Sequence, residues 1–450
     1  MNVQSVIMAA GQGTRMRSSL PKVLHPVLGK PMLWYSLNAL TPVCDDLPVV
    51  IVGHQAERVQ QAVDGLARFA IQEEQLGTAH AVQQARSFLE GQADIVLVTS
   101  ADMLMITEET MRALAEAQKA HDGPMTMLVA ESPAPRGFGR VVRTSDGAVQ
   151  AIIEEAEATP EQRAIRLLNV GVYAFDAAWL WEMLPQVPRA PKGEYYITSL
   201  VHMAVQQGAR VQALEVTDLD EIIGVNTRVH LAEATAAMQR RINTRWMLQG
   251  VTLIDPQRTY IEPQVTIGAD SVIWPNTYLR GASRIGAACE IGPNTIIVDT
   301  VVGDRCRIFS SVLESAVLED EVDIGPFGHL RKGAHLAKGV HMGNFGEVKN
   351  SYLGPGAKMG HFSYLGDATV GAGVNIGAGT ITCNYDGERK HPTQIGDNAF
   401  IGSDTMLVAP VTLGEGARTG AGAVVTKNVP DNALAVGVPA RVIRKFKSGE

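Results

Sequence analysis

The stretch "IEPQVTIGADSVIWPNTYLRGASRIGAACEIGPNTIIV", residues 261–298, carries an aliphatic side chain at every sixth position. These positions are Ile261, Ile267, Ile273, Leu279, Ile285, Ile291 and Ile297. A strict six-residue period is typical of a solenoid in which each hexad forms one short strand and three hexads close a triangular coil of about 18 residues. The aliphatic side chains are then expected to point inward and to form a continuous core.

The same period continues toward the C-terminus, with one-residue slips, as far as Leu413. One long interruption falls between Ile376 and Ile395 and holds "TITCNYDGERKHPTQ". A loop of this length that leaves a regular solenoid usually binds a ligand or packs on a neighbouring chain. We therefore expect the interruption to have a functional role.

The first half of the chain has a different pattern. Short runs rich in β-branched residues, "VQSVIMAA", "LPVVIVG", "ADIVLVTS" and "MTMLVA", alternate with segments of helical spacing. This alternation predicts an α/β domain with a Rossmann-like parallel sheet covered by helices. Ligands of such sheets bind beyond the carboxyl ends of the strands, so we look for chemistry in the loops after Met8, after Val98 and near Gly139.

The two patterns meet at a long helix. Leu231, Ala234, Met238 and Ile242 lie on helical spacing, and Gly250 is suited to the left-handed cap that ends a helix. We therefore predict a first domain over residues 1–226, a linker helix over 227–250 and a solenoid domain over 251–450.

The composition excludes several classes of protein. The chain has 450 residues, of which 46% are hydrophobic and 19% charged, which fits two or three globular domains rather than a disordered chain. Its net charge of -8 gives no overall basic footprint for nucleic acid. The four cysteines are scattered, and no leader or membrane-spanning run is present. These features predict a cytoplasmic protein without disulfides and without a membrane or nucleic-acid partner.

The N-terminal stretch "AAGQGTRMRSSLPK", residues 9–22, combines a glycine turn with Arg15 and Lys22. Backbone amides of such a turn before a helix form a nest for anions, and the two cations suit a triphosphate. Downstream, Gln72, Gly77 and Thr78 offer donors for a nucleobase, and Asp102 follows a predicted strand, where a metal carboxylate would lie. Taken singly, the glycine turn could equally be a structural turn, and an aspartate such as Asp102 is more often a helix cap or a turn former.

The solenoid carries its own candidate chemistry. Arg331 and Lys349 are 18 residues apart and should stack on successive coils, where they form either an anion site or a solvated basic patch. His361 should point outward near Tyr364 and could act as a general base, although an outward histidine is often only a surface residue. His329, His335 and His341 repeat every six residues, and so should lie on three different sides of the coil, where they cannot chelate one metal ion.

The first half resembles the sugar-nucleotide pyrophosphorylase family. Its motifs are "AAGQGTRM", "LPK", "QEEQLGT", the strand-end Asp102, "GFGRVV", "AIIEEAEAT", "LLNVGVYAF" and "IIGVNTR". The resemblance implies that a sugar 1-phosphate attacks the α-phosphorus of a nucleoside triphosphate and that pyrophosphate leaves. It also implies catalytic Arg15 and Lys22, and Mg²⁺ bound by Asp102 and Asn226. The implied nucleotide-sugar contacts are Ala9, Ala10, Gly11, Gly13, Lys22, Gln72, Gly77, Thr78, Gly139, Glu154, Asn169 and Asn226.

The second half resembles the left-handed β-helix of hexapeptide-repeat acyltransferases. "GHLRKGAHL", "HMGNFGEVKNSYLG", "GHFSYLGDA", "VNIGAGTITCNYDG" and "IGSDTMLVAPV" are similar to the acetyltransferase half of the bifunctional UDP-N-acetylglucosamine pyrophosphorylase/glucosamine-1-phosphate N-acetyltransferase family. The resemblance implies that Arg331, Lys349, Tyr364 and Asn375 hold glucosamine 1-phosphate and that His361 is the base. It further implies an acetyl-CoA groove lined by Ala378, Asn384, Tyr385, Ser403 and Ala421, with Arg441 as a displaced candidate.

Taken over the whole chain, the resemblance implies a homotrimer that acetylates glucosamine 1-phosphate with acetyl-CoA. It then couples the product to uridylate from UTP, which supplies a precursor of peptidoglycan and lipopolysaccharide. Two alternatives use the same folds: a pyrophosphorylase whose β-helix only oligomerises or regulates it, and a catalytically idle scaffold. The "NYDG" loop with His361 speaks against the first alternative, and the presence of Arg15, Lys22 and Asp102 speaks against the second.

The sequence departs from the family pattern at three points. "SADM", residues 100–103, has no glycine before Asp102, and "EEAEA" has no lysine after Glu154. Near the C-terminus, "ALAVGVPARV" lacks the arginine that the family places before Val-Pro, which is why Arg441 is only a displaced candidate.

Overall fold

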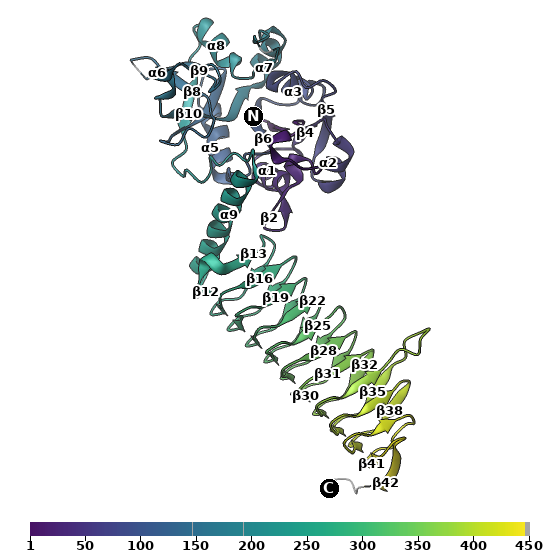
Figure 1. Cartoon of the computed structure of the whole chain (residues 1–450). Helices are drawn as coiled ribbons and strands as arrows, with labels where there is room; N and C mark the ends of the chain where they lie inside the picture. Colours follow the sequence, from purple (N-terminus) through teal and green to yellow (C-terminus); the bar gives the residue numbers. More distant parts are fainter. Residues whose placement is uncertain (146, 192, 446–450) are drawn as a thin grey trace. The chain divides into compact units, whose positions relative to one another are not determined.

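The computed structural model of the protein describes residues 1–145, 147–191 and 193–445 (Figure 1). The chain divides into two compact units, Met1–Met238 and a second unit that begins at Gln239. None of the helices in the described ranges is both long enough and apolar enough to cross a membrane.

A single twisted sheet forms the centre of the N-terminal unit. Its strands are β1 (Val3–Met8), β4 (Val49–Val52), β5 (Arg68–Ile71), β6 (Ile95–Ser100), β7 (Met125–Glu131), β8 (Arg140–Arg143), β9 (Val149–Ile153), β10 (Leu167–Asp176) and β11 (Gln212–Glu215). The main order is β11-β7-β10-β6-β1-β4-β5. The four runs predicted as strands form β1, β4, β6 and β7, and β1 pairs in parallel with both β4 and β6.

The sheet is not wholly parallel, which the sequence did not predict. Strand β10 runs antiparallel between β6 and β7, and the β8–β9 hairpin extends from it. An apolar run that is buried on both faces gives no sign of strand direction, because it reads the same either way. The antiparallel strand matters for function, since it brings β8 and β9 to the edge of the site described below.

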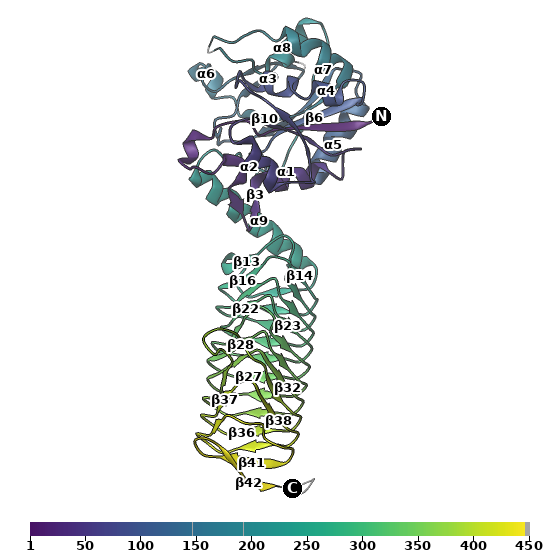
Figure 2. The same ribbon diagram turned by 90° about the vertical axis from the view of Figure 1, so that its right-hand side faces the viewer.

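Helices cover both faces of this sheet (Figure 2). The helices are α1 (Met32–Leu40), α2 (Ala56–Ala62), α3 (Thr78–Gln83), α4 (Arg86–Leu89), α5 (Glu108–Lys119), α6 (Pro160–Arg163), α7 (Ala177–Met183), α8 (Ser199–Gln206) and, at the end of the unit, α9 (Arg228–Leu248). Along β1, Val6 packs in the core beneath α3, α7 and α8, while Ile7 packs in the core beneath α1 and α5. This alternation explains why the strands are apolar on both faces.

The segment after the glycine turn differs from the prediction. Thr14–Met16 forms only one turn of 3-10 helix (η1), and Lys22–Leu24 forms another (η2). Gly13 and Arg17, with φ of 62° and 47°, lie in the left-handed region on either side of η1, and Arg17 ends the turn after three residues. The helix expected after the glycine turn is therefore a single 3-10 turn, and the anion nest remains a prediction. The short hairpin of β2 (Pro26–Val27) and β3 (Lys30–Pro31) precedes α1, and a further 3-10 turn, η3 (Leu184–Gln186), follows α7.

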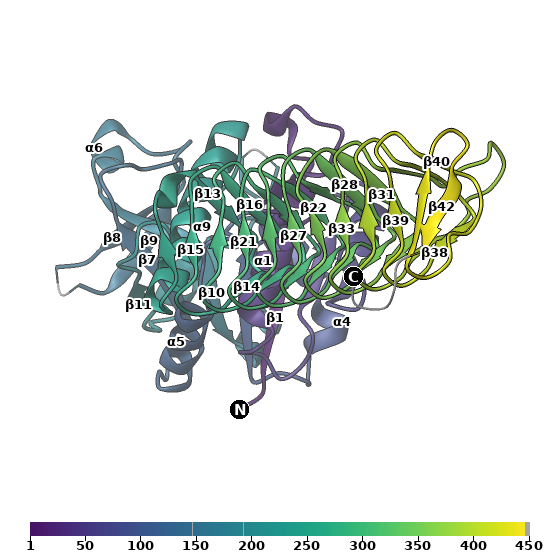
Figure 3. The ribbon, with the colours of Figure 1, turned by 90° about the horizontal axis from the view of Figure 1, so that it is seen from below.

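The second unit is the predicted left-handed parallel β-helix (Figure 3). Its first face holds β12 (Thr252–Leu253), β15 (Val272–Ile273), β18 (Glu290–Ile291), β21 (Arg307–Ile308), β24 (Asp323–Ile324), β27 (His341–Met342), β30 (Lys358–Met359), β33 (Asn375–Ile376), β36 (Phe400–Ile401), β39 (Arg418–Thr419), β41 (Ala433–Val436) and β42 (Arg441–Lys445). The second face holds β13 (Thr259–Ile261), β16 (Thr277–Arg280), β19 (Ile296–Val298), β22 (Val312–Glu314), β25 (His329–Leu330), β28 (Gly346–Lys349), β31 (Ser363–Gly366), β34 (Ile381–Cys383), β37 (Met406–Val408) and β40 (Val424–Val425). The third face holds β14 (Thr266–Ile267), β17 (Arg284–Ile285), β20 (Val301–Val302), β23 (Val317–Leu318), β26 (His335–Leu336), β29 (Tyr352–Leu353), β32 (Ala368–Val370), β35 (Thr393–Ile395) and β38 (Val411–Leu413).

The hexad prediction is confirmed by burial and register. Ile261 pairs with Leu279, and Leu279 pairs with Ile297, so residues 18 apart stack on successive coils. The aliphatic residues of the repeat are buried from Ile261 to Leu413. They form one continuous core, in which each coil covers the apolar end of the one before it.

Helix α9 ends close to the first coil. Gly250 adopts φ of 88°, as expected for the residue that ends the helix. In the second half of α9, the Gln239 and Asn243 side-chain amides donate to the carbonyls of Pro256 and Thr259, which belong to the first coil and its short η4 turn (Pro256–Arg258). This half of the helix caps the open end of the β-helix. The limits 1–226, 227–250 and 251–450 remain the sequence-based proposal for the domains.

The interruption of the repeat is shorter than predicted. Ile381–Cys383 forms a regular strand, β34, and only the following residues leave the coil as a projecting hairpin (Figure 1). Thr382 takes the inward position of this strand, and its hydroxyl accepts a hydrogen bond from the Gly366 amide at 2.7 Å. A search for aliphatic residues misses such a coil, because the inward side chain is polar and is satisfied by the backbone of its neighbour.

Candidate active sites in the two units

A cavity of about 540 Å³ opens in the N-terminal unit beyond the carboxyl ends of β1 and β6. It gathers predicted site residues from segments more than 200 positions apart. Those that line it are Ala10, Gly11, Lys22, Gln72, Gly77, Thr78, Asp102, Gly139, Glu154, Asn169 and Asn226. Ala9 is buried behind the cavity wall, where its amide donates to the Ile51 carbonyl, and Gly13 lies against Lys22.

Three of these polar residues, Lys22, Asp102 and Asn226, meet at one point, where Arg15 joins them. The Lys22 ammonium lies 2.5 Å from Asp102 Oδ2 and 2.8 Å from Asn226 Oδ1. Arg15 Nη2 also donates to Asn226 Oδ1, at 2.8 Å. Asp102 and Asn226 are tied through the backbone as well, because the Val225 amide donates to the Asp102 carbonyl at 3.0 Å. Two cations therefore sit beside the two predicted metal ligands.

This node fits a divalent cation. A carboxylate oxygen of Asp102 and an amide oxygen of Asn226 point at one position, and both are ligands that Mg²⁺ prefers. Within the described residues no cluster of three or more His, Cys, Asp or Glu side chains is present, so the remaining ligands would be water and phosphate oxygens. Lys22, which now fills that position, would have to turn toward the phosphates.

The "QEEQLGT" segment forms one end of the cavity. Gly77 has φ of 108°, and a Cβ atom there would lie 2.6 Å from the Tyr195 carbonyl oxygen, so glycine is required. Buried Gln72 donates to the Gly77 carbonyl at 3.2 Å, and the Thr78 hydroxyl accepts from the Ile197 amide at 2.9 Å. Gln75, which the sequence analysis missed, also lines the cavity and donates to the Ala10 carbonyl at 2.8 Å. Its place in the same motif could have revealed it.

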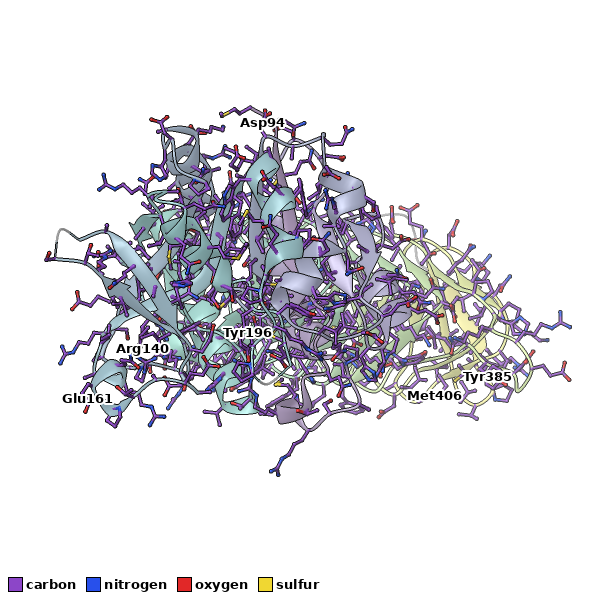
Figure 4. All side chains as sticks on the ribbon, turned by 90° about the horizontal axis from the view of Figure 1, so that it is seen from above. Asp94, Arg140, Glu161, Tyr196, Tyr385 and Met406 are labelled. Carbon is purple, nitrogen blue, oxygen red and sulfur yellow. The ribbon has the colours of Figure 1, made fainter. Side chains whose placement is uncertain are left out.

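The opposite end is formed by β8, β9 and β10. The Asn169 amide donates to the Gly139 carbonyl at 2.9 Å, and its side chain pairs with the buried Tyr173 hydroxyl. Burial raises the pKa of Tyr173, which therefore stays a neutral donor. Glu154 accepts a hydrogen bond of 2.8 Å from the Thr198 hydroxyl. Thr198 and Tyr196 (Figure 4) line this end but lie outside any motif, so sequence analysis missed them.

In the β-helix, the candidates for acetyl transfer collect at the corner between the first and second faces. His361, Ala378, Ser403 and Ala421 each stand two residues after an inward residue of the first face, on successive coils. The Asp404 amide donates to the Ala378 carbonyl, and the Gly422 amide donates to the Ser403 carbonyl, which locks these corners together. A groove of about 310 Å³ is lined by His361, Asn375, Ala378 and Ser403.

Three of the candidates for binding the sugar phosphate, Arg331, Lys349 and Tyr364, lie around the corner, on the second face, whereas Asn375 lies on β33 of the first face. Arg331 and Lys349 stand on adjacent coils, as predicted, and Arg331 forms an ion pair of 2.9 Å with Glu347. Contact with the Lys390 side chain, followed by the charges of Lys390 and Arg331, lowers the pKa of Lys349. Lys390 comes from the hairpin after β34 and was not among the predicted residues. Such crowding of cations favours a bound anion.

The remaining candidates flank this face. The Tyr364 hydroxyl and the Asn384 amide both lie over Gly366, whose missing side chain leaves room for them. Asn384 also donates to Asp367 at 2.5 Å, whereas Tyr385 is exposed on the projecting hairpin (Figure 4). Arg441 is exposed on β42 and contacts only a backbone carbonyl among the interactions of the described residues.

The three regularly spaced histidines behave as predicted. His329, His335 and His341 lie on the second, third and first faces. They pair with the carboxylates of Glu314, Glu319 and Asp323 at 3.2, 3.0 and 2.8 Å. They lie on different sides of the coil and do not form one metal site.

Comparisons with known proteins follow the same division. Residues 4–238 match the nucleotidyl transferase family model, and residues 392–427 match the model of the bacterial transferase hexapeptide, described as six repeats. The chain is 46% identical over 433 residues to "Bifunctional protein GlmU" of Heliobacterium modesticaldum, which covers 96% of this chain and 94% of that protein. It is 44% identical to the protein of the same name from Trichlorobacter lovleyi, covering 99% of this chain and 97% of that protein. The chain belongs to the GlmU family.

As a GlmU protein, the chain is a bifunctional enzyme of UDP-N-acetylglucosamine synthesis, with a nucleotidyltransferase unit and a hexapeptide acetyltransferase unit. A GlmU protein from Geobacillus sp. is similar to the same extent, 44% identical over 442 residues. Matches that run through both units support the two-activity hypothesis over a β-helix that only oligomerises or a catalytically idle scaffold.

Proposed function

We propose that the cavity of the N-terminal unit transfers uridylate from UTP to N-acetylglucosamine 1-phosphate, with Mg²⁺ held by Asp102 and Asn226. The observation that carries this proposal is the meeting of Arg15 and Lys22 with those two oxygen ligands. Bound Mg²⁺ would neutralise phosphate charge as a Lewis acid. The Gln72–Thr78 end suits the uracil, and the Gly139, Glu154 and Asn169 end suits the sugar.

The residues of this site act by positioning and by charge. An ionised oxygen of the sugar phosphate attacks the α-phosphorus, a new P–O bond forms, and the bond to the leaving pyrophosphate breaks. The nucleophile needs no general base, because it is already deprotonated. Arg15 and Lys22 can donate to the phosphate oxygens, where negative charge develops, and the amides of Ala10, Gly11 and Gly13 in the glycine turn can add further donors.

We further propose that the β-helix acetylates glucosamine 1-phosphate at the groove beside His361. His361 would take a proton from the substrate amine as its nitrogen attacks the thioester carbonyl of acetyl-CoA. The N–C bond forms, the C–S bond breaks, and the thiolate leaves with a proton from the medium. Arg331, Lys349, Tyr364 and Asn375 would hold the sugar phosphate, and Ala378, Asn384, Tyr385, Ser403, Ala421 and Arg441 the acetyl-CoA.

We propose a homotrimer in which one chain's corner faces a neighbour's cationic face. Two observations support this. Within one chain, His361 and the Arg331–Lys349 pair lie on opposite sides of a corner, and the hairpin that carries Tyr385 projects away from the coil. In addition, exposed phenylalanines line the same corner: Phe309, Phe327, Phe345 and Phe362. Since all four cysteines are free, we also propose a cytoplasmic location.

The experiment supplies the purified chain with acetyl-CoA, glucosamine 1-phosphate, UTP and Mg²⁺, and follows thiol and pyrophosphate separately. His361→Ala should lose thiol release while it still uridylates pre-acetylated sugar phosphate, and Asp102→Ala should do the opposite. Removal of Mg²⁺ by a chelator should stop only pyrophosphate release. Loss of both activities in either folded variant would contradict two independent sites.

A further inference from the structure

Three distant segments of the N-terminal unit meet a second time behind the uridylyl-transfer site. Arg228, the first residue of α9, donates from Nε to the Met16 carbonyl at 3.3 Å, and its Nη1 lies 3.1 Å from His25 Nδ1. His25 itself is almost fully buried, with 2% of its surface exposed. One guanidinium therefore bridges the glycine turn, the η2 turn and the start of α9.

Each end of this bridge is next to a site residue. Met16 follows Arg15 directly, and Arg228 lies two residues after Asn226. The His25 amide donates to the Lys22 carbonyl at 3.2 Å, which closes the η2 turn. Asn226 contacts the side chains of Arg15 and Lys22. Arg228 contacts the same two segments of the chain at Met16 and His25.

The chemistry of the two side chains fixes their arrangement. Arginine can only donate, so His25 Nδ1 must be the unprotonated nitrogen and the ring must be neutral. Burial, followed by the charge of Arg228, lowers the pKa of His25, while the backbone of Leu20 acts in the opposite sense. The Met32 amide donates to the His25 carbonyl at 3.1 Å, which anchors the acceptor to the start of α1. A lysine could not replace Arg228, because its single ammonium lacks the fork that reaches both acceptors.

We propose that Arg228 and His25 form a clamp that positions Arg15, Lys22 and Asn226 for uridylyl transfer. The proposal rests on the roles proposed above for those three residues. Neither Arg228 nor His25 needs to touch the substrates: the clamp sets the distance between the two cations and the metal ligand. Loss of the clamp should therefore lower kcat and raise the Mg²⁺ concentration needed for half-maximal rate, because both depend on where Asn226 and the cations stand.

The test compares full-length Arg228→Met, Arg228→Lys, His25→Leu and His25→Asn. Asparagine keeps an acceptor close to the position of Nδ1, whereas leucine removes it. We expect kcat for pyrophosphate release to fall roughly 10- to 100-fold in Arg228→Met, Arg228→Lys and His25→Leu, as for a misplacement of about 1 Å. His25→Asn should keep most of the rate, and KM for the sugar phosphate should change by less than about twofold. Acetyl transfer by the same preparations should be unchanged, and a thermal unfolding transition of the N-terminal unit at the wild-type temperature shows that this unit is folded.

Wild-type kcat and Mg²⁺ dependence in Arg228→Met would overturn the clamp. If Arg228→Met misfolds and loses both activities, the two variants of His25 decide. Equal rates in His25→Leu and His25→Asn would overturn the clamp, whereas a higher rate in His25→Asn supports the clamp. Asp102→Ala separates this proposal from the one on which it rests. If Asp102→Ala releases pyrophosphate normally, the proposed site is wrong, whereas an inactive Asp102→Ala beside a fully active Arg228→Met rejects only the clamp.

Discussion

The Lys22 ammonium lies 2.5 Å from Asp102 Oδ2, with only 14% and 19% of the two side chains exposed. It therefore fills the position at which Asp102 and Asn226 would bind a cation. Because both side chains are largely buried, water screens the electrostatic attraction between them only weakly. In the absence of nucleotide, Lys22 should compete with a divalent cation, and the triphosphate should relieve this competition by drawing the ammonium toward its own oxygens.

The first prediction is that Lys22→Met binds Mn²⁺ more tightly than the wild type when no nucleotide is present. Removing the competing ammonium should improve the affinity roughly 3- to 10-fold, since each tenfold change corresponds to about 1.4 kcal/mol. The same substitution should lower kcat for pyrophosphate release. Titration followed by the electron paramagnetic resonance of free Mn²⁺ measures the affinity. Lys30→Met, in β3 and away from the cavity, is the control, and unchanged or weaker Mn²⁺ binding in Lys22→Met would reject the competition.

The second prediction concerns Gly77. In Gly77→Ala, the new Cβ would meet the Tyr195 backbone at 2.6 Å and the residue would keep a strained φ of 108°. The loop must therefore move, and uridylyl transfer should fall by at least about tenfold, with a loss of stability of about 1–3 kcal/mol. Gly91→Ala is the matched control, because Gly91 has φ of 73° but open space around it. Equal rates of pyrophosphate release in the two variants would show that the close approach to Tyr195 is unimportant.

Much of the fold could be predicted because its signals are local and repeated. The inward residues of the β-helix follow one six-residue period, and most of them are aliphatic because they are buried. Their position in the repeat therefore identifies residues such as Ile261 and Leu413 as part of the core. The residues that line the cavity could be predicted because most of them stand in motifs at the ends of strands. By contrast, the antiparallel direction of β10 depends on its connections, and its apolar sequence reads the same in both directions.

Contacts between distant segments could not be predicted from the pattern. Thr198 reaches Glu154 and Lys390 reaches Lys349 only after the chain has folded, and neither stands in a motif. Thr382 was missed for another reason, because a polar side chain takes an inward position when a neighbouring backbone group can satisfy it. Sequence reasoning that seeks only aliphatic residues treats such a coil as a loop.

The third prediction tests that buried hydroxyl. Thr382→Val keeps the shape of the side chain but leaves the Gly366 amide without its acceptor. The β-helix should lose about 1–3 kcal/mol, the cost of a buried unsatisfied donor. Scanning calorimetry of the full chain measures the loss as a lower transition temperature. Thr369→Val, on an exposed position of the same region, should shift the transition little, and equal shifts in both variants would contradict a specific role for the hydroxyl.

The fourth prediction concerns pH. The neighbouring Lys390 lowers the pKa of Lys349, so Lys349 loses its positive charge at a lower pH than an ordinary lysine. As pH rises through this lowered pKa, binding of the sugar phosphate should weaken and its KM should rise. In Lys390→Met the pKa of Lys349 moves back up, so the rise in KM should begin at a higher pH. Steady-state acetyl transfer across an alkaline pH series measures this, with Lys427→Met, at an exposed position away from the groove, as control. If the rise in KM instead begins at a lower pH in Lys390→Met, the predicted direction of the Lys349 pKa shift is wrong.

The last prediction links assembly to one activity only. Phe327 and Phe345 stack with ring centroids 5.1 Å apart, and they are 58% and 60% exposed on the corner that also carries His361. Both residues adopt left-handed φ values, 62° and 57°, which a bulky side chain tolerates only at a cost. Aromatic rings held outward at such a cost are suited to a contact between chains.

A carboxylate placed in that contact should therefore separate the copies. We expect Phe345→Glu to shift the chain from trimer to monomer in sedimentation equilibrium and to reduce acetyl transfer at least tenfold, because burying an unpaired charge opposes association. Uridylyl transfer should persist, since its cavity is formed within a single N-terminal unit. Leu66→Glu, at an exposed apolar position in the bend between α2 and β5, is the control and should stay trimeric. A monomeric Phe345→Glu with full acetyl transfer would instead mean that one β-helix holds a complete site.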